Sequence, residues 1–195
     1  MMTVTIAKAI WVFGVVAWFV VRYPHQRMAR KAPIARRFGG WRERVLLSIS
    51  FTGLGLIPGV YVFTGEPRFA DYASSPFQTV VGGLLMVGAL VLFRLTHKQL
   101  GRNWSVTLDT RQRHRLVDTG IYSRLRHPMY SAFWLLALAQ AFLLPNWIAG
   151  LAGPVAWGTL FFMRIGREEK MMVDTFGDEY LRYVERTKRV IPWVY

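Results

Sequence analysis

The sequence predicts an all-α, polytopic membrane protein with about five transmembrane helices, the last two forming a tight hairpin. Of its 195 residues, 53% are apolar and only 18% are charged, which is too few charges for an ordinary soluble domain. The charges are also clustered, because long apolar stretches hold almost none while the segments between them are rich in arginine. Alternating apolar and basic segments are typical of helices that cross a bilayer.

We predict that the first three stretches are membrane helices. Residues 4–21 are interrupted only by Lys8 and are followed by arginines, which predicts a retained span rather than a signal peptide. Residues 45–64 form the second stretch, with Pro58 and several glycines, which membrane helices tolerate. The third stretch is 80–95, and we expect its helix to extend by about one turn at either end.

The fourth and fifth stretches, 129–144 and 147–165, are joined by Pro145 and Asn146. A bilayer core needs about 20 residues per helix, so both stretches are short. We therefore expect a tight hairpin that is tilted or does not quite cross. All of these elements belong to a single membrane domain spanning residues 1–195.

The basic residues orient the helices. Segments 22–44, 94–126 and 164–195 hold eight, eight and seven Lys/Arg, together 23 of the 25 in the chain. If all five stretches cross, these segments share one side of the membrane, and the positive-inside rule makes that side cytosolic.

Composition also excludes several classes of partner. The net charge is +14, but the basic residues lie between apolar stretches rather than on a folded polar surface, so we expect membrane lipids and no nucleic acid. The chain has no cysteine and therefore no disulfide, thiol nucleophile or thiolate metal site. Its histidines are scattered without ligand spacing, so we expect no metal. They are His25, His97, His114 and His127.

A charged motif, Arg126-His127-Pro128-Met129-Tyr130, comes just before the hairpin. Pro128 suits the first position of a helix, where its missing N–H costs nothing. The helix N-terminus then offers free N–H groups and a partial positive charge, which suit a carboxylate, with His127 beside it. The alternative is that Pro128 only starts the helix and His127 only lies at the interface.

A second charged pair follows the hairpin. Arg164 and Glu168 are four residues apart, so one helical face carries both. An ordinary surface ion pair is the alternative, but Arg164 ends an apolar run, where an arginine usually has an anionic partner. Glu168 is a suitable acceptor for ribose hydroxyls or an ammonium. Gly53 and Gly55, with Gly59, lie inside an apolar span and predict helix packing rather than a nucleotide loop.

The C-terminal half holds five blocks of polar and aromatic residues: His97-Lys98-x-Leu100-Gly101-x-Asn103-Trp104, His114-x-Leu116-Val117-x-x-Gly120-Ile121-Tyr122, Arg126-His127-Pro128-Met129-Tyr130, Arg164 with Glu168-Glu169, and Phe176-Gly177-Asp178-Glu179-Tyr180-x-x-Tyr183. In order and spacing, these blocks resemble those of the isoprenylcysteine carboxyl methyltransferase family. The blocks cover roughly residues 94–193, while the first helices, within 1–97, resemble the family only in layout. The chain departs from the family in lacking a glutamine near Thr107.

The resemblance implies a membrane methyltransferase that converts S-adenosylmethionine to S-adenosylhomocysteine in a cytosol-facing site built by residues 98–195. It places these residues against the cofactor: His114, Leu116, Val117, Tyr122, His127, Pro128, Met129, Tyr130 and Glu168. Arg164 is the implied catalytic residue and would face the carboxylate of a lipophilic acceptor, such as a C-terminal isoprenylcysteine, that enters from the bilayer.

Two alternatives remain open at this point. A related enzyme of the same group methylates a phospholipid amine or a small thiol, and a non-catalytic protein of this layout would only bind lipid. Transfer to a carboxylate needs no general base, because that nucleophile is already ionised; alignment and exclusion of water suffice. The ring faces of Tyr122 and Tyr130 suit a sulfonium.

Overall fold

The computed structural model describes residues 2–31, 34–37, 40–101, 109–111, 116–192 and 194. Its α-helices are α1 (Met2–Lys31), α2 (Trp41–Phe51), α3 (Ile57–Thr64), α4 (Pro76–Leu100), α5 (Pro128–Leu143), α6 (Trp147–Phe176) and α7 (Asp178–Arg186). A π-helical turn, η1 (Thr52–Leu56), joins α2 to α3, and two short 3-10 helices are η2 (Arg68–Ala70) and η4 (Gly120–Ser123). Two strands are β1 (Ile34–Arg37) and β2 (Asp109–Arg111).

The helices agree with the five predicted stretches in number and order. In the described part of the chain, α1, the continuous α2–η1–α3, α4 and α6 are long and apolar enough to cross a membrane, while α5 has 16 residues. The expectation of two short helices holds only for α5. α6 does not stop with the apolar stretch at Ile165 but continues to Phe176, so it carries the charged residues that follow.

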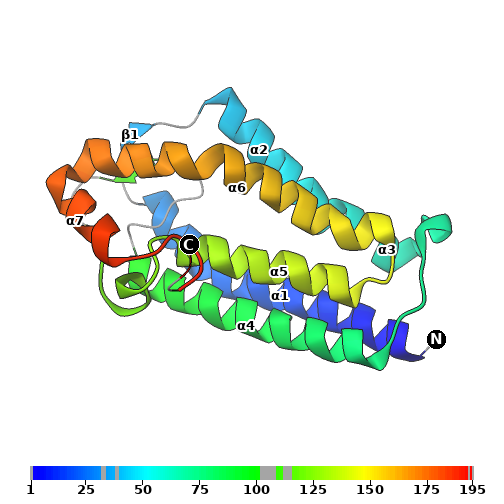
Figure 1. Cartoon of the computed structure of the whole chain (residues 1–195). Helices are drawn as coiled ribbons and strands as arrows, with labels where there is room; N and C mark the ends of the chain where they lie inside the picture. Colours follow the sequence, from blue (N-terminus) through cyan, green and yellow to red (C-terminus); the bar gives the residue numbers. More distant parts are fainter. Residues whose placement is uncertain are drawn as a thin grey trace.

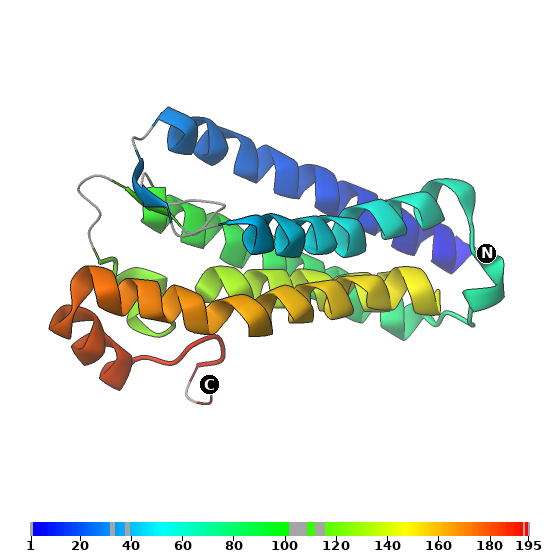
Figure 2. The same ribbon diagram turned by 90° about the horizontal axis from the view of Figure 1, so that it is seen from above.

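The helices lie roughly alongside one another, in an order that differs from their order in the chain (Figures 1 and 2). α5 packs against both α4 and α6, α1 packs on α4 and α5, and α2–η1–α3 packs along α6. The segment that follows α7 turns back toward the start of α5 (Figure 1).

One end of the bundle, called the basic end here, holds the end of α1 and the starts of α2 and α5, together with the last turns of α4 (Figure 1). There β1 pairs antiparallel with β2, with Ile34 opposite Arg111. This pairing brings the first two basic segments to the same end, as the charge count predicts. The all-α prediction missed both strands, because strands of four and three residues leave no periodic pattern in the sequence.

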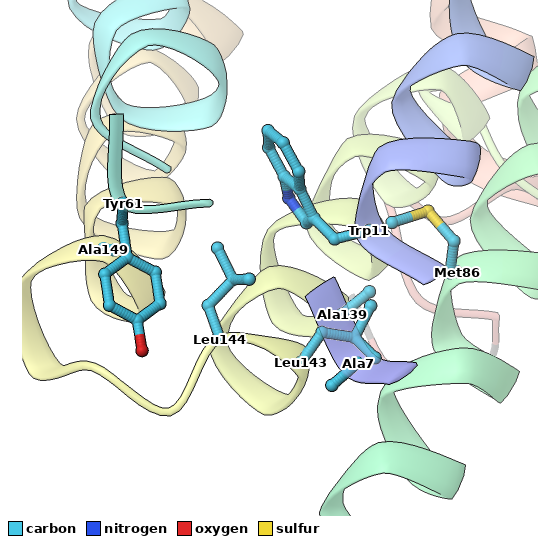
Figure 3. Close-up of a cluster of buried hydrophobic side chains, with 8 residues drawn as sticks. All are labelled: Ala7, Trp11, Tyr61, Met86, Ala139, Leu143, Leu144 and Ala149. Carbon is cyan, nitrogen blue, oxygen red and sulfur yellow. The ribbon is translucent and has the colours of Figure 1, made fainter. Parts of the chain in front are cut away.

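A buried cluster lies toward the opposite end, where α1, α3, α4, α5 and the start of α6 meet (Figure 3). Its members are Ala7, Trp11, Tyr61, Met86, Ala139, Leu143, Leu144 and Ala149. Glycines allow these helices to approach closely: a Cβ on Gly14 would lie closer than 3.0 Å to Met86, and one on Gly82 equally close to Leu143. Such close packing of small residues holds helices together where lipid removes the hydrophobic driving force.

Gly53 brings the second membrane helix into contact with α6. A Cβ on Gly53 would lie closer than 3.0 Å to Ala156 Cβ and to the Ala152 carbonyl oxygen. The predicted packing role is therefore confirmed for Gly53. It does not extend to Gly59, where an added Cβ would meet no atom within 4 Å.

The backbone at this contact is a π turn, and a buried amide completes its hydrogen bonding. The Ile57 N–H donates to a carbonyl five residues back. In that register the Gly53 carbonyl would pair with Pro58, which has no N–H. Gln140 of α5, only 1% exposed, donates to the Gly53 carbonyl at 3.0 Å. A carbonyl without a partner in the membrane interior is thus avoided.

We expect Gly53→Ala to destabilise the protein by about 1–3 kcal/mol, because the added methyl group pushes α2–η1–α3 away from α6. Gly59→Ala is the matched control, since it adds the same atom to the same continuous helix without a clash. It should be neutral or slightly stabilising. Thermal unfolding in detergent measures the difference, and equal melting temperatures for the two variants would contradict this account of the contact.

Candidate functional site

The predicted charged residues meet at the basic end, where α2, α5 and α6 converge. Their surroundings are apolar and buried, and comprise Leu46, Ala137, Trp157, Leu160, Phe161, Ile165 and Val190. Charges in such surroundings require partners, because transfer from water is costly unless each charge is compensated.

Arg164 is the centre of the site. It is only 9% exposed, and two carboxylates compensate its charge. Its Nη1 lies 3.0 Å from Glu43 Oε1, and its Nε lies 3.4 Å from Glu168 Oε2. The pairing with Glu168 was predicted from their spacing. Glu43, which is 1% exposed in the first turn of α2, was missed.

One signal in the sequence points to Glu43. It is the single acid in the basic segment 22–44 and lies just before an apolar stretch. An acidic residue just before an apolar helix is expected in the first turn of that helix, because the helix dipole stabilises negative charge there. Its partner, however, is 121 positions away in the sequence, so no local pattern identifies Arg164 as that partner.

Glu168 is held by residues of the predicted motif before α5. Tyr130 Oη donates to Glu168 Oε2 at 2.7 Å, and His127 Nδ1 lies 3.9 Å from Glu168 Oε1. The rings of His127 and Tyr130 meet edge to face, and Tyr130 also contacts Trp157 and Phe161. The carboxylate therefore lies beside aromatic rings.

Glu169 binds a different set of residues from Glu168. Its Oε1 lies 3.1 Å from Arg126 Nε and 3.4 Å from His127 Nε2, and its Oε2 lies 2.7 Å from Arg189 Nη2. Two guanidinium groups bind this one carboxylate from both sides. Glu169 thus links α6 to the segment before α5 and to the segment after α7.

The C-terminal segment forms one side of the site. Backbone N–H groups of Arg126 and His127 donate to the carbonyls of Lys188 and Arg189, at 2.7 and 2.9 Å. Val190 is buried beside the site. The turn from α6 into α7 that makes this return possible uses Gly177, whose φ of 54° is accessible to glycine.

The start of α5 agrees with the prediction only in part. Pro128 is the first helical residue, as expected. The Tyr130 N–H, however, already donates to the His127 carbonyl at 3.0 Å, and the His127 N–H donates to the Arg189 carbonyl at 2.9 Å. The first turn therefore offers fewer free donors than an isolated helix N-terminus.

Tyr122 lies close to this cluster and is fixed by α7. Tyr183 Oη donates to the Tyr122 carbonyl at 2.6 Å and to the Leu125 carbonyl at 3.3 Å. Burial raises the pKa of both phenols, and the charge of Glu168 raises that of Tyr122 further. Both groups are consequently neutral at physiological pH.

The remaining predicted residues are placed as follows. Met129 points toward α4, where its sulfur accepts from Thr96 Oγ1 at 3.7 Å. Leu116 and Val117 are half-buried in the segment before η4. His114 and Thr107 lie outside the described residues. Within the described chain, no group of three metal-ligating side chains is present.

Comparisons with known proteins show which proteins this chain is similar to. The model of the isoprenylcysteine carboxyl methyltransferase family matches residues 80–174. The protein-S-isoprenylcysteine O-methyltransferase of Schizosaccharomyces pombe is 32% identical over 126 residues, which are 64% of this chain and 53% of that protein. A probable protein-S-isoprenylcysteine O-methyltransferase of Oryza sativa is 25% identical over 154 residues, 78% of each protein.

The fold also has a counterpart among solved structures. The structure of the eukaryotic intramembrane Ras methyltransferase ICMT superimposes with a TM-score of 0.53 at 21% identity, over 78% of this chain and 53% of that chain. The chain thus spans about half the length of that structure and of the S. pombe relative. By family match and relatives, this integral membrane protein belongs to the isoprenylcysteine carboxyl methyltransferase family.

Proposed function

We propose that the protein transfers a methyl group from S-adenosylmethionine to the carboxylate of a lipophilic acceptor, a C-terminal isoprenylcysteine or a close analogue. The observation that carries this proposal is the buried guanidinium of Arg164, held by carboxylates at the basic end of an apolar bundle. The relatives that carry the name protein-S-isoprenylcysteine O-methyltransferase support the choice of acceptor.

The residues present fit the proposed cofactor. The Glu168 carboxylate suits ribose hydroxyls or an ammonium, and the imidazole of His127 suits a polar group beside it. The rings of Tyr122 and Tyr130 offer faces for a sulfonium. S-adenosylmethionine, when bound, supplies a methyl group activated by the positive sulfur. The resemblance assigns five further residues to it, of which Met129 points toward α4 and one lies outside the described residues: His114, Leu116, Val117, Pro128 and Met129.

Arg164 would orient the acceptor. A carboxylate is ionised at neutral pH, so the site needs no general base. A guanidinium held by two carboxylates cannot swing freely, and a fixed guanidinium aligns a bound carboxylate. The apolar neighbours exclude water, and alignment with exclusion of water can supply several kcal/mol of the barrier reduction.

An apolar groove supports a lipid-like acceptor. The groove, with a volume of about 530 Å³, lies between α2–η1 and α6. Arg44, next in sequence to Glu43, lines it, and so do Ile49, Val155 and Ala156. A hydrocarbon chain of the acceptor would fit such a groove while its polar end remains near the basic end.

A second candidate follows from the charges. In the immediate contacts of Arg164, two carboxylates face one guanidinium group, and this local excess of negative charge suits a cationic acceptor, although Arg126 and Arg189 balance it across the whole cluster. The amine of a phospholipid such as phosphatidylethanolamine would bind as an ammonium ion and would have to lose a proton, for which Glu168 is the nearest accessible carboxylate, before its nitrogen could accept the methyl group. It is the alternative that the assay below tests.

The proposed function is tested with labelled S-adenosylmethionine and three acceptors: a farnesylated cysteine analogue, phosphatidylethanolamine vesicles and a small thiol. We expect label to pass to the farnesylated cysteine and not to its methyl ester, the matched control that lacks a free carboxylate. Transfer to the phospholipid alone would establish the second candidate. Failure to bind S-adenosylhomocysteine in calorimetry would instead favour a non-catalytic lipid-binding protein.

Glu168→Gln should weaken S-adenosylhomocysteine binding at least about 10-fold, a loss of about 1.4 kcal/mol, because the neutral amide is a poorer acceptor for hydroxyl and ammonium donors. Isothermal titration calorimetry measures the loss. Glu185→Gln on α7, an exposed position, is the matched control and should bind normally. Unchanged binding by Glu168→Gln would remove Glu168 from the cofactor site.

Arg164→Lys should lower kcat/KM for the acceptor about 100-fold and change S-adenosylhomocysteine affinity less than about 3-fold. Lysine keeps the charge but loses the planar donor fork that orients a carboxylate. Arg167→Lys, on an exposed face of the same helix, is the control. Losses of equal size in acceptor use and cofactor affinity would show that Arg164 is structural.

A further inference from the structure

We infer that Glu43 is a positioning residue for the acceptor site, acting through Arg164. It touches neither cofactor nor acceptor, and it holds the guanidinium in the orientation from which Arg164 binds the acceptor carboxylate. This inference rests on the proposed function and deepens it, because it assigns a specificity role to a helix that lies outside the family-matched residues 80–174.

The first argument is the difference in exposure between the two carboxylates on Arg164. The Glu43 side chain is 1% exposed, whereas that of Glu168 is 24% exposed. A ligand can therefore reach Glu168 but not Glu43. The contact from Glu43 is also the shorter of the two, at 3.0 Å against 3.4 Å.

The second argument concerns what Glu168 is required to do. If Glu168 accepts hydrogen bonds from the cofactor, it cannot at the same time be the sole counter-charge of a buried guanidinium. Glu43 binds Nη1, while Glu168 approaches Nε, on a different part of the group. The charge of Arg164 thus stays compensated by Glu43 when Glu168 is occupied by a ligand.

The third argument is that the packing of the helices fixes this contact. α2–η1–α3 and α6 are antiparallel, and Gly53 lies against Ala152 and Ala156. Glu43 lies ten residues before Gly53 on one helix, and Arg164 lies eight residues after Ala156 on the other. Both contacts therefore belong to one register of the two helices, so the close approach at Gly53 also sets the position of Glu43.

The experiment is a double-mutant cycle with Glu43→Gln, Arg164→Lys and the combined variant, in the full chain. Glu66→Gln is the matched control, because it removes the same charge from an exposed residue in the connection between α3 and η2. The measurements are acceptor KM and kcat with a farnesylated cysteine analogue, S-adenosylhomocysteine affinity by calorimetry, and melting temperature.

We expect Glu43→Gln to raise the acceptor KM at least about 10-fold, with S-adenosylhomocysteine affinity changed less than about 3-fold. In the Arg164→Lys background the same substitution should have little further effect, because interacting residues are not additive. A merely structural Glu43 would lower the melting temperature and the active fraction while leaving the acceptor KM unchanged.

Independent effects that multiply in the double variant would overturn the inference, as would equal losses in acceptor KM and cofactor affinity. If Glu43→Gln does not fold, Glu43→Asp, which keeps the charge on a shorter side chain, takes its place with the same expected direction. If the unaltered protein methylates none of the acceptors, the proposed function fails. The cycle in melting temperature then still decides whether Glu43 and Arg164 are coupled, and additivity there would overturn the coupling itself.

Discussion

The positive charge of Arg164, buried where the apolar part of α6 ends, is the constraint around which the other elements are arranged. A guanidinium in these surroundings is tolerated only with compensating carboxylates. One comes from the next turn of its own helix and the other from α2, through Glu43. Tyr130 then fixes Glu168 by its hydroxyl, so the start of α5 is bound to the same charge. The site therefore joins three helices through one side chain.

A second set of contacts keeps these helices in place at a distance from the charge. Gln140 reaches from α5 to the Gly53 carbonyl of the π turn. At the far end, Asn146 caps α6 by accepting from the Ala149 N–H at 2.9 Å and donates to Asp71 Oδ1 at 2.8 Å. Buried amides of this kind replace the hydrophobic driving force that lipid-embedded helices lack. The scaffold of the site is consequently polar at a few points and apolar elsewhere.

Most of the fold follows from local sequence patterns, and the parts that do not are those set by long-range contacts. The five apolar stretches, the start of α5 at Pro128 and the pairing of Arg164 with Glu168 are readable from composition and spacing. The length of α6 cannot be read in this way, because the apolar stretch ends at Ile165 while the helix continues to Phe176. The role of Glu43 cannot be read from a short stretch of sequence either, because it depends on how α2 packs against α6.

Glu43 lies on a helix far from Arg164 in the sequence, and this separation affects how such a site can change during evolution. The carboxylate and the guanidinium stand on helices separated by most of the chain, and each is costly to bury without the other. Loss of Arg164 alone leaves the buried carboxylate of Glu43 without its partner, and loss of Glu43 alone leaves Glu168 as the remaining carboxylate on Arg164. The effect of a change at one of these positions therefore depends on the residue at the other, and α2 is constrained by the chemistry at the other end of the sequence.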